Sequence, residues 1–191
     1  MYLWNGGKLM GKIFLTSDLH FGHSKSFLWE PRGFNSSKEH DETIICNWNL
    51  LVSPEDDVYV LGDLMLEDTH YGLTCVSRLN GRLHLVRGNH DSDIRWNHYA
   101  NLPNVVELCG WAEVIKYRKI LFHLSHWPTE TANYDDTDSL RGHIISLSGH
   151  THKKEQFHDD NPFKYNVALD ANNNVPVLLD DIIDKIRERI Q

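Results

Sequence analysis

Five short groups of polar residues along this chain carry side chains of the types that bind divalent metals. Carboxylate, amide and imidazole donors without thiolate suit Mn, Fe, Zn or Ni rather than Ca. Together they are numerous enough for two adjacent metals, and a bridged metal pair activates water against phosphate esters. In chain order the groups are Asp18-Leu19-His20, Gly62-Asp63, Gly88-Asn89-His90-Asp91, His126 and Gly149-His150-Thr151-His152.

These groups need strands to position them, and the hydrophobic pattern predicts one before each group. Short apolar runs that end at polar residues predict strands over 12–17, 57–61, 83–86, 119–124 and 144–148. Apolar residues at helical spacing predict helices over 41–51 and 178–190, and a third that ends near 79. Further strands are expected over 105–108, 112–117 and 165–169, with a hairpin turn through Arg118. Alternating strands and helices indicate an α/β layered fold, in which ligands bind at the strand ends.

The spacing within the groups suggests how the ligands are arranged. Asp18 and His20 are two residues apart, so an extended backbone would point both side chains the same way. His150 and His152 have the same spacing and form a second two-pronged arm. Asp63 follows a glycine that permits a tight turn, and its single carboxylate is suited to bridge two cations.

The third group contains a histidine that metal binding does not need. Asn89 offers an amide oxygen, while His90 beside it cannot easily reach the same ion and stays free for acid–base work. Asp91 either orients His90 or caps the turn, and a plain turn is the alternative for the whole group. Near the fourth group we prefer His126 to His123, because His123 lies within an apolar run.

Composition limits the classes of protein. The chain has 191 residues, 13 of them His, and a formal net charge of -8, which gives no overall basic footprint for nucleic acid. Three distant cysteines, no signal-like start and no apolar run of membrane-spanning length favour the cytoplasm and no membrane partner. We expect one domain over 1–191, with a core over about 12–170 and a C-terminal helix over about 178–190.

The five groups, in this order, resemble the calcineurin-like metallophosphoesterase superfamily, especially its small bacterial and phage members, from about Ile13 to Asp170. The resemblance implies an αββα sandwich of two mixed β-sheets flanked by helices, with a dinuclear metal site at the C-terminal ends of the strands. It implies Mn²⁺ first, with Fe, Zn, Ni or Co as alternatives. The implied ligands are Asp18, His20, Asp63 and His152 for the first metal, and Asp63, Asn89, His126 and His150 for the second.

The implied activity is hydrolysis of a small, nucleotide-like phosphodiester or phosphomonoester, with the diester favoured. A metal-bridging hydroxide would attack phosphorus, and His90 would act as general acid, with Asp63 and Asp91 completing the catalytic set. Substrate contacts are expected from His23, Asn89, His90 and Arg87, although a loop histidine or arginine is as often simply solvated.

One departure from the superfamily narrows the substrate, and two other functions stay open. Its protein phosphatases carry GDxxDRG, whereas Leu66 and Glu67 replace the second Asp and the Arg here, which disfavours a phosphoprotein substrate. The alternatives are a nuclease on short or single-stranded nucleic acid and a non-catalytic metal-binding scaffold. Oligomeric state is open between monomer and homodimer. Several aromatic residues near the groups could stack a base or simply pack: Phe21, Phe27, Trp29, Trp96, Trp127 and Tyr134.

Overall fold

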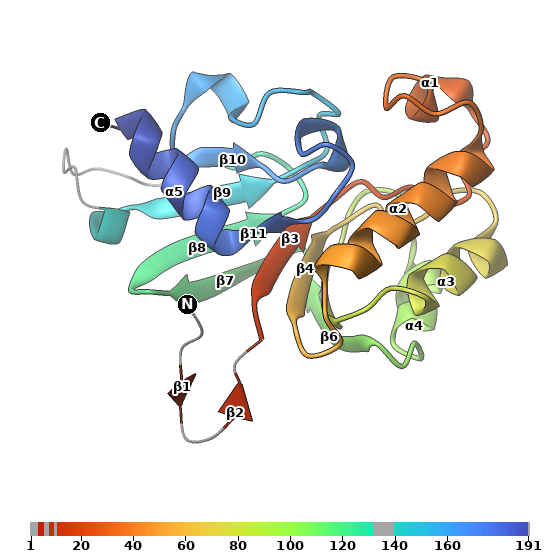
Figure 1. Ribbon diagram of the computed structural model, residues 1–191, viewed down its shortest axis with the longest axis horizontal. Helices are drawn as coiled ribbons and strands as arrows, with labels where there is room; N and C mark the ends of the chain where they lie inside the picture. Colours follow the sequence, from red (N-terminus) through yellow and green to blue (C-terminus); the bar gives the residue numbers. More distant parts are fainter. Residues whose placement is uncertain (1–3, 6–7, 10, 132–139, 191) are drawn as a thin grey trace.

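The first of two large sheets is mostly parallel and carries three of the five polar groups at its strand ends. The structure, a computed structural model, describes residues 4–5, 8–9, 11–131 and 140–190, so Tyr134 lies outside it. Strands β3 to β6 run parallel, and β11 pairs antiparallel with β3 at the edge (Figure 1). The sheet order is β11 (Val177–Leu178), β3 (Ile13–Thr16), β4 (Asp57–Leu61), β5 (Arg82–Val86) and β6 (Val105–Gly110).

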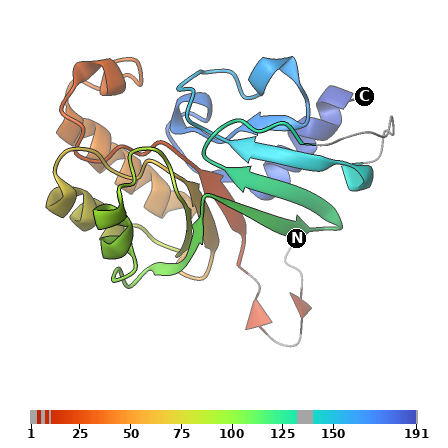
Figure 2. The same ribbon diagram turned by 180° about the vertical axis from the view of Figure 1, so that it is seen from behind.

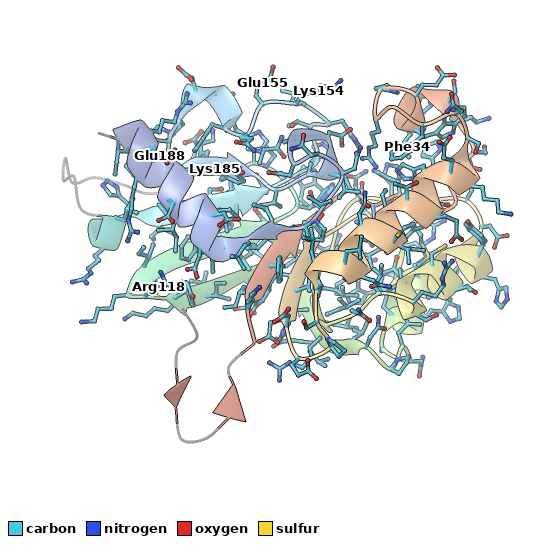
Figure 3. The ribbon with its side chains drawn as sticks, in the orientation of Figure 1. Phe34, Arg118, Lys154, Glu155, Lys185 and Glu188 are labelled. Atoms are coloured by element: carbon cyan, nitrogen blue, oxygen red, sulfur yellow. The ribbon has the colours of Figure 1, made fainter. Side chains whose placement is uncertain are left out.

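The second large sheet carries the other two groups. Its order is β10 (Lys164–Asn166), β9 (Ile144–Ser148), β8 (Ile120–Ser125) and β7 (Ala112–Tyr117). Strands β7 and β8 form the expected antiparallel hairpin, whose turn residues Arg118 and Lys119 both have positive φ. Figure 3 labels Arg118 at this turn, which is the end of the hairpin far from His126. A separate short pair joins β1 (Trp4–Asn5) and β2 (Lys8–Leu9).

Helices flank the two sheets, and alternating strand residues build two apolar clusters. One face of the five-stranded sheet packs against α2 (Ser37–Leu51), α3 (Thr69–Ser77) and α4 (Asp93–Tyr99) (Figure 2). The opposite face shares a cluster with β8, β9 and the apolar side of α5 (Leu179–Ile190). The expected α/β architecture of two mixed sheets flanked by helices is confirmed. Shorter helices are α1 (Ser26–Trp29) and the 3-10 turns 140–142, 158–160 and 169–171.

Helix α2 begins earlier than hydrophobic spacing alone predicts, because polar capping residues set its start. The backbone N–H of Glu39 donates to the Ser36 hydroxyl, and the Glu39 carboxylate accepts from the backbone N–H of Asn35. Such reciprocal caps satisfy helix-start N–H groups that have no intrahelical acceptor. Helix α4 is capped by Ser92 and was not expected from the hydrophobic pattern.

Three parallel strands are joined by a histidine between two carboxylates, which leads to a pH prediction. The His84 ring lies 3.0 Å from Asp57 Oδ1 and 2.7 Å from Glu107 Oε2. Burial lowers the pKa of His84, but these two hydrogen bonds outweigh it and the pKa is raised overall. A raised folded-state pKa stabilises the fold fully below the unfolded value of about 6.5 and loses that effect as pH rises through the folded value.

We therefore expect His84→Gln to lower the free energy of unfolding more at pH 6 than at pH 9. Urea unfolding at both pH values, with a chelator present, measures the difference between the two proteins. An equal loss at both pH values would contradict the expected charge on His84.

Candidate metal centre

All five polar groups meet at one end of the two sheets, where β3, β4, β5, β8 and β9 finish. Backbone hydrogen bonds join the loops beyond the strands. The N–H of Asp18 donates to Gly62 O, the N–H of His20 donates to Asp63 O, and the N–H of Gly149 donates to His126 O. These hydrogen bonds tie the loops to one another.

Asp63 lies between two sets of candidate ligands. Its Oδ2 is 3.7 Å from His20 Nε2 on one side and 3.4 Å from His126 Nε2 on the other. Its Oδ1 accepts a 2.9 Å hydrogen bond from the backbone N–H of His90, so the carboxylate cannot turn freely. Asp63 Oδ2 therefore faces ring nitrogens of both candidate ligand sets.

The two carboxylate oxygens of Asp18 have different surroundings, and only one of them is hydrogen-bonded to the protein. Oδ2 accepts hydrogen bonds from the Ser17 hydroxyl and from the backbone N–H of His150. Oδ1 is fully buried and has no hydrogen-bond partner among the described residues, although it lies 3.8 Å from His20 Nε2 and 3.7 Å from His152 Nε2. A buried carboxylate oxygen without a partner is costly, and a bound cation removes that cost.

The second set gathers potential ligand atoms around His126. His126 Nδ1 lies 2.9 Å from the Leu61 carbonyl oxygen, which only accepts, so Nδ1 carries the ring proton. His126 Nε2 then presents a lone pair toward Asn89 Oδ1 at 2.9 Å and His150 Nδ1 at 3.0 Å. Nitrogen and oxygen donors that converge in this way suit a divalent transition metal.

The first set has a similar arrangement. His152 Nδ1 lies 3.1 Å from Asp170 Oδ2, while its Nε2 is 3.2 Å from His20 Nε2. Burial lowers the pKa of His20 to about 4, so this imidazole is neutral near pH 7 and able to ligate. Burial also lowers the pKa of His152, but the Asp170 hydrogen bond together with the charges of Asp18 and Asp170 outweighs it and raises the pKa overall.

The backbone of the candidate ligands is unusual. Positive φ angles occur at five of the seven expected metal ligands, namely Asp18, His20, Asp63, His150 and His152. The left-handed region is uncommon for residues other than glycine and costs on the order of 1 kcal/mol or more each. The expectation that an extended backbone aligns Asp18 with His20 is therefore wrong, because left-handed turns bring their side chains together. Such strain concentrates at functional sites.

Two glycines make this close packing possible. Gly62 has φ +88°, and a Cβ there would lie 2.6 Å from the Cα of Gly88. At Gly149 a Cβ would lie 1.9 Å from Ser17 Oγ and 2.3 Å from Asp18 Oδ2. Any larger residue at Gly149 would displace the Asp18 carboxylate.

His90 stands at the edge of both candidate sets. Its side chain is 42% exposed, its Nε2 lies 3.9 Å from Asp63 Oδ2, and its ring centroid is 5.6 Å from that of His20. Asp91, by contrast, accepts hydrogen bonds from the backbone N–H groups of Gly88 and Asp63 and from the Tyr99 hydroxyl. These contacts match the turn-capping alternative for Asp91. They make it a residue that positions Asp63 rather than one that touches the His90 ring.

The two remaining expected substrate contacts differ in their surroundings. His23 packs beside the first set, with its ring centroid 6.1 Å from that of His20, and its Nδ1 accepts from the backbone N–H of Lys25. Arg87 donates to the Asp91 carbonyl and the Asp93 carboxylate, and its guanidinium lies over the Trp111 ring. These partners would compete with phosphate for the same donors, and the phosphate contact expected of Arg87 stays a prediction.

The sequence did not indicate the residues that hold the first ligand set from behind, Asp170 and Arg32. Asp170 binds Arg32 through both carboxylate oxygens, at 3.0 and 2.7 Å, as well as His152. Arg32 also donates to the Asp18 carbonyl, and its Nη1 lies 2.9 Å from Nε2 of the buried His40. Burial raises the pKa of Asp170, but His152 and Arg32 outweigh it and lower the pKa overall. No spacing rule connects residues 32, 152 and 170. The only sequence signal for their contact was an Asp close to the last predicted strand.

We expect Asp170→Asn to weaken both the fold and metal binding. It leaves the buried Arg32 without its carboxylate, which costs about 3 kcal/mol of unfolding free energy. It also frees the His152 ring, which lowers metal affinity roughly 10- to 100-fold. Urea unfolding and Mn²⁺ titration of the folded variant measure the two effects. Asp93→Asn is the control, because its carboxylate pairs with Arg87 but is 88% exposed. Equal behaviour of the two variants would contradict the role of Asp170.

Comparison with known proteins places the chain in a family. It is 32% identical over 185 residues to the uncharacterized protein MJ1445 of Methanocaldococcus jannaschii, covering 94% of this chain and 93% of that protein. The chain belongs to the MJ1445 family. The Gene 66 protein of Mycobacterium phage D29 is 30% identical, with 95% of this chain and 96% of that protein covered. No family model matches the chain.

The fold of this MJ1445-family member also occurs in a solved structure. The protein of unknown function AQ665 from Aquifex aeolicus superposes with a TM-score of 0.69 at 22% identity, covering 91% of this chain and 98% of that one. At this level of identity the likeness concerns the fold. Within the described residues, no helix is both long and apolar enough to cross a membrane.

Proposed function

We propose that this protein is a metal-dependent phosphoesterase that hydrolyses a small phosphodiester or phosphomonoester, with the diester preferred. The observation that carries the proposal is Asp63 Oδ2, which lies within 4 Å of both His20 and His126 while Oδ1 is tied to the His90 backbone. The unpartnered Asp18 Oδ1 and the resemblance of the five groups to calcineurin-like metallophosphoesterases support it.

The residues fit two divalent transition metals, with Mn²⁺ as our first choice. Asp18, His20, Asp63 and His152 would hold the first, and Asp63, Asn89, His126 and His150 the second. Bound there, such a pair supplies a nucleophilic water of lowered pKa and neutralises phosphoryl charge. The clusters Asp18–His20–His152 and Asp18–Asp63–His126 each bring ligand atoms within 4.8 Å of one another.

The chain's own contribution is orientation and proton transfer. Asp170 and the Leu61 carbonyl hold His152 and His126 with their Nε2 atoms toward the centre. His90, exposed and outside both ligand sets, would donate a proton to the leaving oxygen from Nε2. The buried ligands exclude water from one side of the centre, and His90 stands on the accessible side.

The test compares two chromogenic substrates after metal stripping and controlled reloading. Bis-p-nitrophenyl phosphate reports diester hydrolysis, p-nitrophenyl phosphate reports monoester hydrolysis, and elemental analysis counts the metals retained. We expect Mn²⁺-dependent turnover that is faster on the diester. A protein that retains two metals and turns over neither ester would instead be the non-catalytic scaffold.

A further inference from the structure

Two exposed tryptophans lie side by side next to the second ligand set. Trp111 is 56% exposed and Trp127 is 36% exposed, and their ring centroids are 5.8 Å apart at an interplanar angle of 35°. The Trp127 ring centroid is 5.0 Å from that of His126 and 6.0 Å from that of His150. An indole surface of this size, open to solvent and touching candidate metal ligands, has no role in the chemistry described above.

Backbone structure, rather than chance side-chain contact, brings these two rings together. Ala112 pairs with Ser125 at the end of the β7–β8 hairpin, so Trp111 comes just before that pair and Trp127 just after it. The Arg87 N–H donates to the Gly110 carbonyl, and Gly110 has φ +75°, which turns the chain into Trp111. The Ser125 hydroxyl donates to the Trp127 carbonyl and holds the second loop. The pair is therefore anchored to β8, which leads into His126, and is linked through Gly110 to the loop after β5, which contains Asn89.

A cation adjoins the pair. The Arg87 guanidinium carbon lies 4.7 Å from the Trp111 ring centroid, and its donors are held by Asp91 and Asp93. This contact is a cation–π interaction, and the Arg87 charge itself is paired with Asp93. A flat ring attached to a phosphate would meet this stacking surface beside the candidate metal ligands.

We propose that Trp111 and Trp127 form a stacking platform for the nucleobase of the substrate, which makes the substrate a nucleotide phosphoester. The inference rests on the proposed function, because the phosphate of the same molecule would lie at the metal centre. Indole surfaces stack any base through its π-face, and loss of one such contact costs about 5- to 100-fold in affinity. The platform selects for a base and discriminates weakly among bases.

The first measurement is binding of adenosine 5′-monophosphate against ribose 5-phosphate, which keeps the phosphate and lacks the base. Isothermal titration calorimetry on the Mn²⁺-loaded protein gives both affinities without turnover. We expect the nucleotide to bind at least about fivefold more tightly. Trp111→Ala is expected to abolish that preference while leaving ribose 5-phosphate binding unchanged. Trp111 is the residue of choice because it contacts neither His126 nor His150 in the way that Trp127 does.

Phe27→Ala is the matched control, since Phe27 is 71% exposed and packs against His23 on the side of the first set. It should keep the base preference. Preference lost in Phe27→Ala and kept in Trp111→Ala would overturn the platform. The platform would also be overturned if the wild-type protein bound both ligands equally. It would likewise be overturned if sedimentation showed a wild-type dimer that Trp111→Ala converts to a monomer with unchanged nucleotide affinity.

The experiments distinguish a failure of the stacking platform from a failure of the proposed phosphoesterase activity. Turnover of bis-p-nitrophenyl phosphate without base preference would overturn the platform and leave the phosphoesterase intact. Base-dependent binding by a two-metal protein that hydrolyses neither chromogenic ester would support the platform and overturn the phosphoesterase.

Discussion

Asp63→Asn is expected to lower kcat on bis-p-nitrophenyl phosphate at least about a thousandfold and to reduce the metal content below two per chain. The reason is that Asp63 Oδ2 lies within 4 Å of ring nitrogens of both His20 and His126. A shared metal pair contributes several kcal/mol of charge stabilisation, and about 4 kcal/mol corresponds to a thousandfold in rate. Asparagine tolerates the positive φ of 56° at this position, so the backbone is preserved.

The same variant should become more stable when stripped of metal. Burial raises the pKa of Asp63, and the nearby Asp18 and Asp91 carboxylates add to this, so the ionised form destabilises the metal-free fold near pH 7. Thermal unfolding in chelator is therefore expected to shift upward in Asp63→Asn, and added Mn²⁺ should stabilise it less than the wild type. Asp68→Asn is the matched control, because Asp68 caps α3 and asparagine caps equally well. Unchanged metal content in Asp63→Asn would refute the bridging role.

His90→Ala is expected to keep both metals and the fold while lowering kcat about a hundredfold or more, which is the usual scale for an acid–base group. The His90 ring is exposed at the edge of the centre and belongs to neither ligand set, so its removal exposes no buried charge. The decrease in kcat should be largest for substrates whose leaving group needs a proton. A dinucleoside phosphate, whose leaving alkoxide is strongly basic, should lose more rate than bis-p-nitrophenyl phosphate.

The control is His98→Ala, which removes an exposed histidine from the end of α4. It should match the wild type on every substrate. Equal losses for good and poor leaving groups would show that His90 stabilises phosphoryl charge instead of protonating the leaving oxygen. An unchanged kcat with two metals bound would remove His90 from the mechanism.

The hydrophobic pattern was enough to place the main strands and the order of the polar groups. A strand buried on both faces leaves a continuous apolar run, and the run ends where the polar loop begins. Leu15, Leu61 and Val86 turn toward one cluster, while Phe14, Val60 and Leu85 turn toward the other. Because parallel strands end at one edge, Asp18, Asp63 and Asn89 had to converge there. Helix α4 and the start of α2 depend on Ser caps that hydrophobic periodicity does not register.

Contacts between residues far apart in the chain could not be predicted from the spacing of residues in the sequence. Asp91 lies beside His90 in the chain, yet its carboxylate faces the Asp63 backbone and the Tyr99 hydroxyl. Arg87 packs on Trp111, which follows β6, and this contact was not indicated by spacing; its expected contact with phosphate stays a prediction. Each outcome depends on loop geometry that no local pattern encodes.

The sequence alone determined the ligand types, their order and their position after strands, since these depend on residue chemistry and local hydrophobicity. Only the tertiary structure decided which oxygen of Asp18 and of Asp63 is free, which ring nitrogen of His126 and of His152 faces the centre, and which tryptophans meet beside it. These choices depend on hydrogen-bond partners supplied from other loops. A carboxylate offers two equivalent oxygens and an imidazole offers two distinct nitrogens, and folding selects one atom of each by occupying the other.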